Sequence, residues 1–370
     1  MGESAPVFDY TSGTPWVHTK ELTAELEAAQ ARGESVADAW SRADVDLLRN
    51  DDEYAEQFRD RFRRAGVDVI SVTLGSRINP DLPYSERVMR DLARWQARFD
   101  SRDWLCKVTT PSEARAIAGS DDVGIVLNTQ NLGRAIDADL DRIEDLYDAG
   151  VRIMQLTYNR QNLLGTGCTD YSAGGLSALG REAVERIESA DAVPDLSHCN
   201  RKTTLDTLKH ADGPVAFTHV SCGALADHQR AKSDEELELL REVDGYVGIV
   251  AIPTFLAPQE DAPSFDVFFD HIDHAISIVG IERVGIGTDF PNLDADIPDQ
   301  LIPEIKERAA DNLWRKEHRA TAGLADGFGR FERYEDWQHI RQGLAERYDA
   351  DEVEGILGRN FLAFWERVTG

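Results

Sequence analysis

The stretch "AVPDLSHCNRKTTLDTLKHADGPVAFTHV" (192–220) decides the fold. Its apolar, β-branched runs predict strands at 192–198 and 214–220, and the apolar spacing between them predicts a helix at 202–211. A strand, a helix and a strand in this order indicate a parallel βαβ unit. Each of the two predicted strands contains a histidine near its carboxyl end, which makes this unit the starting point for function as well.

The same alternation extends to both sides of this unit. The other predicted strands lie at 66–75, 104–109, 123–131, 151–159, 245–252 and 283–290, and the other predicted helices at 85–102, 111–119, 137–150, 178–190, 233–243 and 265–280. Eight strands that alternate with helices favour an α/β fold of the TIM type, a (β/α)8 barrel, with extra helices at the C-terminus. A doubly wound open sheet is the alternative, but no glycine-rich phosphate fingerprint follows the first predicted strand.

Composition limits the classes of partner. The chain of 370 residues is 42% hydrophobic, and we expect a single domain spanning residues 1–370. Its net charge of −28 argues against nucleic acid as a partner, because phosphate binding needs a basic surface. Only seven of the 40 basic residues are lysine, so the surface is that of either a protein from a high-salt cytoplasm or an ordinary acidic protein.

Cellular location is predicted from what the sequence lacks. No run of 18 apolar residues is present, so no membrane partner is expected. The N-terminal stretch "MGESAPVFDYTSG" lacks the basic and apolar regions of a secretory signal. The four cysteines have no C-x-x-C spacing, which favours a reducing, cytoplasmic environment.

Polar residues lie near the ends of five predicted strands. They are Gln130, Tyr158, His198, His219 and Asp289. Active sites of such barrels lie at the carboxyl ends of the strands, so these side chains are expected to converge at the barrel mouth. Two imidazoles and a carboxylate form a known catalytic zinc set that leaves one position for water.

Structural roles for the same residues stay open at this point. A single histidine at a strand end is often only a hydrogen-bonded residue of the core, and Asp289 could cap the turn that follows it. His271 and His274 lie three residues apart on one predicted helix and are expected to form part of a helix face.

Several segments, in the same order, resemble the membrane (renal) dipeptidase family of the amidohydrolase superfamily. The resemblance covers the chain from about residue 65 to the C-terminus and rests on "AGVRIMQLTYNRQNLLGTG", "GLSALGREAVERI", "DLSHCNRKTTLDTL", "GPVAFTHVSCGAL", "RVGIGTDF" and "ILGRNFLAFWERV". It implies a (β/α)8 barrel with two zinc ions, in which a metal-bridging water attacks the peptide carbonyl of a dipeptide.

The resemblance assigns roles to four residues. His198 and His219 match the two histidines that hold the second zinc, and Asp289 matches the acid that handles the proton. Arg230 falls where the family has an arginine that binds the substrate carboxylate, a task that suits the planar guanidinium. A simple surface arginine is the alternative for Arg230.

The sequence departs from the family at the other metal site. The family has a His-x-Asp pair after its first strand, but the corresponding stretch, "VFDYTSGTPW", has Thr11 and Gly13 at these positions. The bridging glutamate is replaced by Gln130, and a substrate-contacting histidine by Tyr158. We therefore expect one divalent metal, zinc first with manganese or iron as alternatives. His198 and His219 would hold it, with Asp289 as third ligand or general base and Gln130 as an added oxygen.

The expected function is that of a metal-dependent hydrolase of the dipeptidase type. It would cleave an amide bond in a small substrate whose carboxylate Arg230 binds, while Tyr158 donates a hydrogen bond to the developing oxyanion. Hydrolysis of a non-peptide amide or lactone, a decarboxylation, and a non-catalytic barrel are the alternatives. A homodimer is left open, and the polar segment 293–337 is a candidate lid over the barrel mouth.

Overall fold

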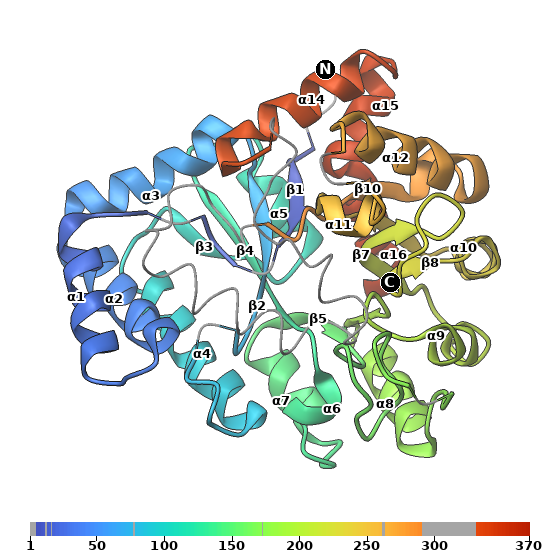
Figure 1. Ribbon diagram of the computed structural model, residues 1–370, viewed down its shortest axis with the longest axis horizontal. Helices are drawn as coiled ribbons and strands as arrows, with labels where there is room; N and C mark the ends of the chain where they lie inside the picture. The colour runs from blue at the N-terminus through green and yellow to red at the C-terminus, as the bar shows by residue number, and fades with distance from the viewer. Residues whose placement is uncertain are drawn as a thin grey trace.

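Eight parallel strands form a nearly closed barrel, as predicted (Figure 1). The computed structural model describes residues 5–11, 13–15, 17–76, 78–171, 173–260, 263–290 and 331–370. The strands pair in the order β1 (Phe8–Tyr10), β2 (Val69–Thr73), β4 (Val123–Thr129), β5 (Val151–Gln155), β6 (Val193–Asp195), β7 (Ala216–Cys222), β9 (Tyr246–Ile249) and β10 (Val284–Ile286). The backbone N–H of Asp289, just after β10, donates to the carbonyl of Tyr10 at 3.0 Å and joins the two ends of the path.

One of the eight predicted strands does not lie on this path. The strand predicted at 104–109 is β3 (Leu105–Lys107), which pairs only with the first residues of β4. The eighth strand of the barrel is β1. It was not predicted from the sequence pattern, although it lies in the stretch that the resemblance aligned with the family's first strand. A two-residue strand, β8 (Ala231–Lys232), pairs with the end of β7 outside the path.

Helices lie around the strands in Figure 1. Most fall where they were predicted: α4 (Tyr84–Phe99), α5 (Pro111–Ile117), α7 (Arg142–Asp148), α8 (Ala178–Ser189), α9 (Arg201–Leu208), α10 (Asp234–Glu242) and α12 (Asp266–Val279). Two single-turn helices, α6 (Leu132–Ala135) and α11 (Pro253–Leu256), follow β4 and β9. Between β1 and β2 the chain adds three helices that were not predicted: α1 (Lys20–Ala31), α2 (Val36–Asn50) and α3 (Asp52–Ala65).

The predicted C-terminal helices are present as α14 (Trp337–Ala345), α15 (Ala350–Glu354) and α16 (Asn360–Thr369). Helix α16 closes one end of the barrel with Phe361, Phe364 and Trp365, which belong to one buried cluster with the first residues of several strands. Phe361 stacks on Phe8, the first residue of β1, with ring centroids 3.8 Å apart. Since α16 occupies the amino ends of the strands, the opposite end is left for polar side chains.

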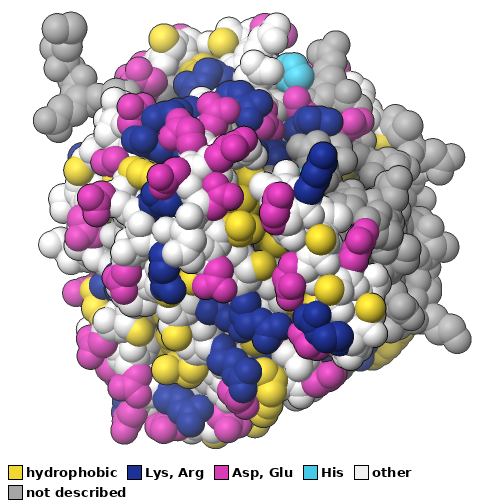
Figure 2. Space-filling model, turned by 90° about the vertical axis from the view of Figure 1, so that its left-hand side faces the viewer, with side chains coloured by type: hydrophobic (Ala, Val, Ile, Leu, Met, Phe, Trp, Pro, Cys, Tyr) yellow, Lys and Arg dark blue, Asp and Glu magenta, His cyan; other side chains and the backbone are white. Residues whose placement is uncertain are grey.

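The acidic surface carries interspersed charges rather than a patch of one sign on the face shown in Figure 2. Exposed arginines also pair with carboxylates across short distances, as in Arg42–Glu34 at 3.1 Å. Such exposed pairs contribute little to stability. In the described part of the chain, no helix combines the length and the apolar character needed to cross a bilayer.

Candidate functional site

Two histidines meet at the polar end of the barrel. The Nε2 atoms of His198 and His219 lie 3.0 Å apart, and both side chains are buried. Neither strand ends as predicted: β6 stops at Asp195, so His198 lies in the following turn, and β7 continues to Cys222, so His219 lies inside the strand. The sequence thus predicted the convergence of this pair but misplaced the strand ends.

Asn159 and Tyr158 hold the ring of His198. The Oδ1 atom of Asn159 contacts His198 Nδ1 at 2.7 Å, and the phenol of Tyr158 stacks on the imidazole with centroids 4.4 Å apart. The carbonyl of His198 accepts a hydrogen bond from the backbone N–H of Cys168 at 2.8 Å. The loop after β5 therefore fixes both the ring and the backbone of this residue.

His219 is oriented by an irregularity in its own strand. The pairing register between β7 and β9 shifts between Phe217 and Val220, and such irregularities redirect side chains near functional sites. The carbonyl of Thr218 approaches Gly248 and Gly287 so closely that a Cβ on either glycine would lie 2.1 or 2.0 Å from it. The turned ring of His219 then stacks on Tyr10, with centroids 4.6 Å apart.

A buried carboxylate lies behind the histidine pair. Asp195 is inaccessible to solvent and accepts hydrogen bonds from the backbone N–H and hydroxyl groups of Ser197 and Thr218, at 2.6 to 3.1 Å. Burial raises the pKa of Asp195, and the hydrogen bonds from Ser197 and Thr218 oppose this shift. Four donors stabilise the charged form of this carboxyl group.

Two buried cations hold the backbone around the histidines. Arg230 donates to the carbonyls of Ser197 and His219, each at 3.0 Å, and Lys232 donates to the carbonyl of Cys199 at 3.0 Å. Arg230 is only 3% exposed, which rules out the alternative of a surface arginine. Burial, with Arg230 nearby, lowers the pKa of His198 and His219 well below 6.5, so both imidazoles are neutral at physiological pH.

Asp289 lies close enough to the predicted site for its charge to raise the pKa of Tyr158, which stacks on His198. Its backbone adopts a left-handed conformation with φ of 57°, which is uncommon for residues other than glycine but is tolerated by aspartate. Burial raises the pKa of Asp289 to about 7, against the opposing effect of the Arg230 charge. Among the described residues, no group of three or more His, Cys, Asp and Glu side chains is placed to hold a metal ion.

The neutral residues of the predicted site are Gln130, which is buried, and Tyr158, which is half-buried. Burial and the charge of Asp289 raise the pKa of Tyr158, which keeps its phenol protonated. The side-chain nitrogen of Gln130 and the Nε atom of Arg230 are buried and have no hydrogen-bond partner among the described residues. Buried donors of this kind are costly unless a ligand or water satisfies them.

The position that the resemblance aligned with the first zinc ligand holds an internal hydrogen bond instead. The hydroxyl of Thr11 is buried, and two backbone carbonyls lie within hydrogen-bonding distance of it: that of Gly13 at 2.7 Å and that of Ser71 at 3.1 Å. A threonine engaged in this way and a glycine supply no anionic or imidazole ligand.

The two helix histidines have structural roles, as expected. The buried ring of His271 bridges the backbone N–H of Cys222 at 2.9 Å and the carbonyl of Leu256 at 3.0 Å, while His274 pairs with Asp234 at 2.9 Å. Residues 293–330 of the candidate lid lie outside the described residues.

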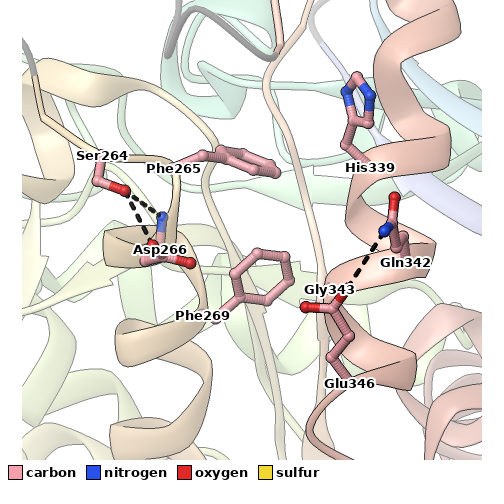
Figure 3. Close-up of a pocket in the computed structure, with 8 residues that line it drawn as sticks. All are labelled: Ser264, Phe265, Asp266, Phe269, His339, Gln342, Gly343 and Glu346. Atoms are coloured by element: carbon pink, nitrogen blue, oxygen red, sulfur yellow. Dashed lines mark hydrogen bonds between the residues drawn. The ribbon is translucent and has the colours of Figure 1, made fainter.

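A cavity of about 230 Å³ lies apart from the histidine pair, between α12 and α14 (Figure 3). Phe265 and Phe269 face His339 and Gln342 across it. None of the residues that line it is a predicted site residue. The candidate site is therefore assigned from the barrel-mouth residues and not from this cavity.

Comparison with known proteins agrees with the resemblance. The sequence model of the family described as membrane dipeptidase (peptidase family M19) matches residues 64–312, about two thirds of the chain. An uncharacterized dipeptidase of Schizosaccharomyces pombe is 29% identical over 259 residues, which cover 68% of this chain and 55% of that protein. The chain spans about half the length of the curated relatives it matches.

Solved structures share the fold. An amidohydrolase from Pseudomonas aeruginosa superimposes with a TM-score of 0.71 and 24% identity, over 85% of this chain and 93% of that chain. A metallopeptidase from Rhodobacter sphaeroides, solved with a phosphinate mimic of the dipeptide L-Ala-D-Ala, gives a TM-score of 0.72 and 18% identity over 99% of both chains. At these identities the likeness concerns the barrel and its C-terminal helices.

Proposed function

Because the chain belongs to the membrane dipeptidase family (peptidase family M19), we propose that it is a metal-dependent hydrolase that cleaves an amide bond in a small, dipeptide-like substrate. The observation that carries this proposal is the buried pair of neutral imidazoles, whose Nε2 atoms face each other at 3.0 Å. Neutral imidazole nitrogens are the commonest metal ligands in proteins, and hydrogen bonds to the other ring nitrogen hold them in place.

One metal ion fits the residues that are present. His198 and His219 would hold it, whereas Thr11 and Gly13 offer no ligands for a second ion, and the neutral amide of Gln130 bridges cations poorly. A bound ion supplies a water activated at neutral pH and polarises the substrate carbonyl. We propose zinc as this ion, with manganese or iron as alternatives.

The surrounding side chains suit the remaining tasks. Asp289 has a pKa of about 7 and can hold or release a proton near neutrality. Tyr158 stays protonated and can donate to a developing oxyanion. Arg230 and Gln130 have buried donors without partners among the described residues, and these suit a substrate carboxylate.

We expect purified protein saturated with zinc to hold about one equivalent of the metal and to hydrolyse dipeptides such as L-Ala-D-Ala. Metal content by elemental analysis, with release of free amino acids as the activity assay, tests both parts. About two equivalents would contradict the single site. One equivalent without turnover of any dipeptide would favour a non-peptide amide, a lactone or a decarboxylation substrate. No bound metal under zinc- and manganese-replete conditions would favour a non-catalytic barrel.

We also expect kcat/KM to rise as the pH increases through about 7, because Asp289 acts as a base only when it is ionised. Protonation below this pH removes the base, so the rate should fall about tenfold for each pH unit on the acid side. A pH profile of kcat/KM in the wild type and in Asp289→Asn provides the measurement. A wild-type profile that is flat from pH 5.5 to 8, or an Asp289→Asn variant with the same slope, would argue against this role.

A further inference from the structure

The hydroxyl group of Thr218 lies between a carboxylate and an imidazole. Its oxygen is 2.7 Å from Asp195 Oδ2, 2.8 Å from His219 Nδ1 and 3.1 Å from Ser197 Oγ. A hydroxyl group carries one proton and can accept further hydrogen bonds. Only one neighbour can therefore receive its proton.

Asp195 is the neighbour that fixes the direction of this proton. Two backbone N–H groups and two hydroxyl groups surround its oxygens, and this environment favours the ionised carboxylate, which only accepts hydrogen bonds. Among the described residues, Thr218 supplies the hydrogen-bond donor at Oδ2, so its proton points to Asp195. The oxygen of Thr218 must then accept from the ring of His219, which places a proton on Nδ1 and a lone pair on Nε2.

Asn159 has the same effect on His198. Its Oδ1 atom is an acceptor, so the contact of 2.7 Å places a proton on His198 Nδ1 and a lone pair on Nε2. The two Nε2 lone pairs then face each other across 3.0 Å. Two lone pairs at this distance repel each other, and a cation between them removes the repulsion.

We propose that Asp195 and Thr218 are positioning residues, which act through a carboxylate–hydroxyl–imidazole relay that fixes the tautomer of His219 and presents its Nε2 atom to a metal ion. This role rests on the proposed function in so far as a metal binds the pair. The tautomer itself is a property of the metal-free protein. Partners of this kind orient metal-bound histidines, and their loss typically weakens metal binding by about 10- to 100-fold.

Three substitutions separate this role from a general effect on packing. Thr218→Val keeps the branched shape but removes the acceptor for His219 Nδ1, and Thr218→Ser restores the hydroxyl group. Ser197→Ala is the matched control: Ser197 Oγ is also buried and donates to Asp195 at 2.6 Å, but its contact with His219 involves the backbone N–H and not the ring. Both hydroxyl deletions should lower the urea midpoint of unfolding to a similar extent.

Zinc affinity, measured by competition with a chromophoric chelator, should distinguish the variants. We expect the Kd to rise by about 10- to 100-fold in Thr218→Val and to stay within about threefold of the wild type in Thr218→Ser and Ser197→Ala. Equal losses in Thr218→Val and Ser197→Ala, or an unchanged Kd in Thr218→Val, would overturn the relay.

Nitrogen-15 NMR of the imidazole rings in metal-free protein provides an independent test. In the wild type we expect the ring proton of His219 on Nδ1. In Thr218→Val we expect it on Nε2, because the remaining acceptor for the ring is then Nε2 of His198. A wild-type proton on Nε2 would overturn the inference whether or not zinc binds. Failure of the wild type to bind zinc, with the proton found on Nδ1, would contradict the proposed metal but leave the relay supported.

Discussion

Replacing His198 or His219 by alanine is expected to abolish zinc binding and, with it, hydrolysis. Each imidazole contributes one of the two Nε2 atoms that face each other at 3.0 Å, and no third His, Cys, Asp or Glu ligand is grouped with them among the described residues. A single remaining imidazole would hold the ion weakly. Loss of a residue that hydrogen-bonds to a metal ligand typically weakens metal binding by about 10- to 100-fold. Loss of the ligand itself should therefore weaken zinc binding by more than about 100-fold.

Elemental analysis and the dipeptide assay measure this expectation, with His274→Ala as the control. The ring of His274 likewise has a polar side-chain partner, Asp234 at 2.9 Å, but His274 lies on α12 outside the barrel mouth. Its removal should leave zinc content and turnover unchanged. If zinc content stayed the same after both His198→Ala and His219→Ala, the assignment of the metal to this pair would be wrong.

The pair could be found from sequence because each histidine follows an apolar run in a regular strand–helix alternation. The residues that position it could not. Asn159 in the loop after β5 and Thr218 inside β7 are ordinary polar residues, and nothing local indicates that each contacts an imidazole nitrogen. The one available signal was Asp195, an acid inside an apolar run, because buried carboxylates generally have partners.

Seven of the barrel strands were predicted because their β-branched runs are flanked by amphipathic helices. The three-residue strand β1 is too short for such a pattern, and Gly13 and Pro15 follow it closely in the sequence. The segment at 104–109 has the composition of a strand but pairs with only three of the seven residues of β4. Whether such a segment enters the barrel depends on pairing with distant residues, which local periodicity does not report.

Asp9 illustrates the same limit and is central to closure of the barrel. Its carboxylate lies in β1, is inaccessible to solvent, and accepts hydrogen bonds from residues more than 270 positions away. Thr288 donates its backbone N–H at 2.8 Å and its hydroxyl at 2.7 Å, Tyr334 its hydroxyl at 3.2 Å, and Trp337 its indole N–H at 3.0 Å. One side chain therefore connects β1, the turn after β10 and the C-terminal helices.

Replacing Asp9 by alanine is expected to lower the free energy of unfolding by about 4 kcal/mol, because four buried donors lose their acceptor at once. Burial raises the pKa of Asp9 to about 6, so the carboxyl group is ionised at neutral pH, and its bonds to these donors are charge-assisted. Urea unfolding of metal-free protein at pH 7.5 would measure the change.

Two further variants show whether the effect comes from the shared acceptor. Tyr334→Phe removes only one donor and leaves the carboxylate with the other three, so it should cost about 1 kcal/mol. Asp9→Asn keeps the shape of the side chain but places an amide N–H₂ group against hydrogen-bond donors. Its loss in free energy of unfolding should therefore lie between those of Tyr334→Phe and Asp9→Ala. If Asp9→Ala cost no more than Tyr334→Phe, water would be able to replace the carboxylate, and closure of the barrel would depend on apolar packing and on the Asp289–Tyr10 backbone hydrogen bond instead.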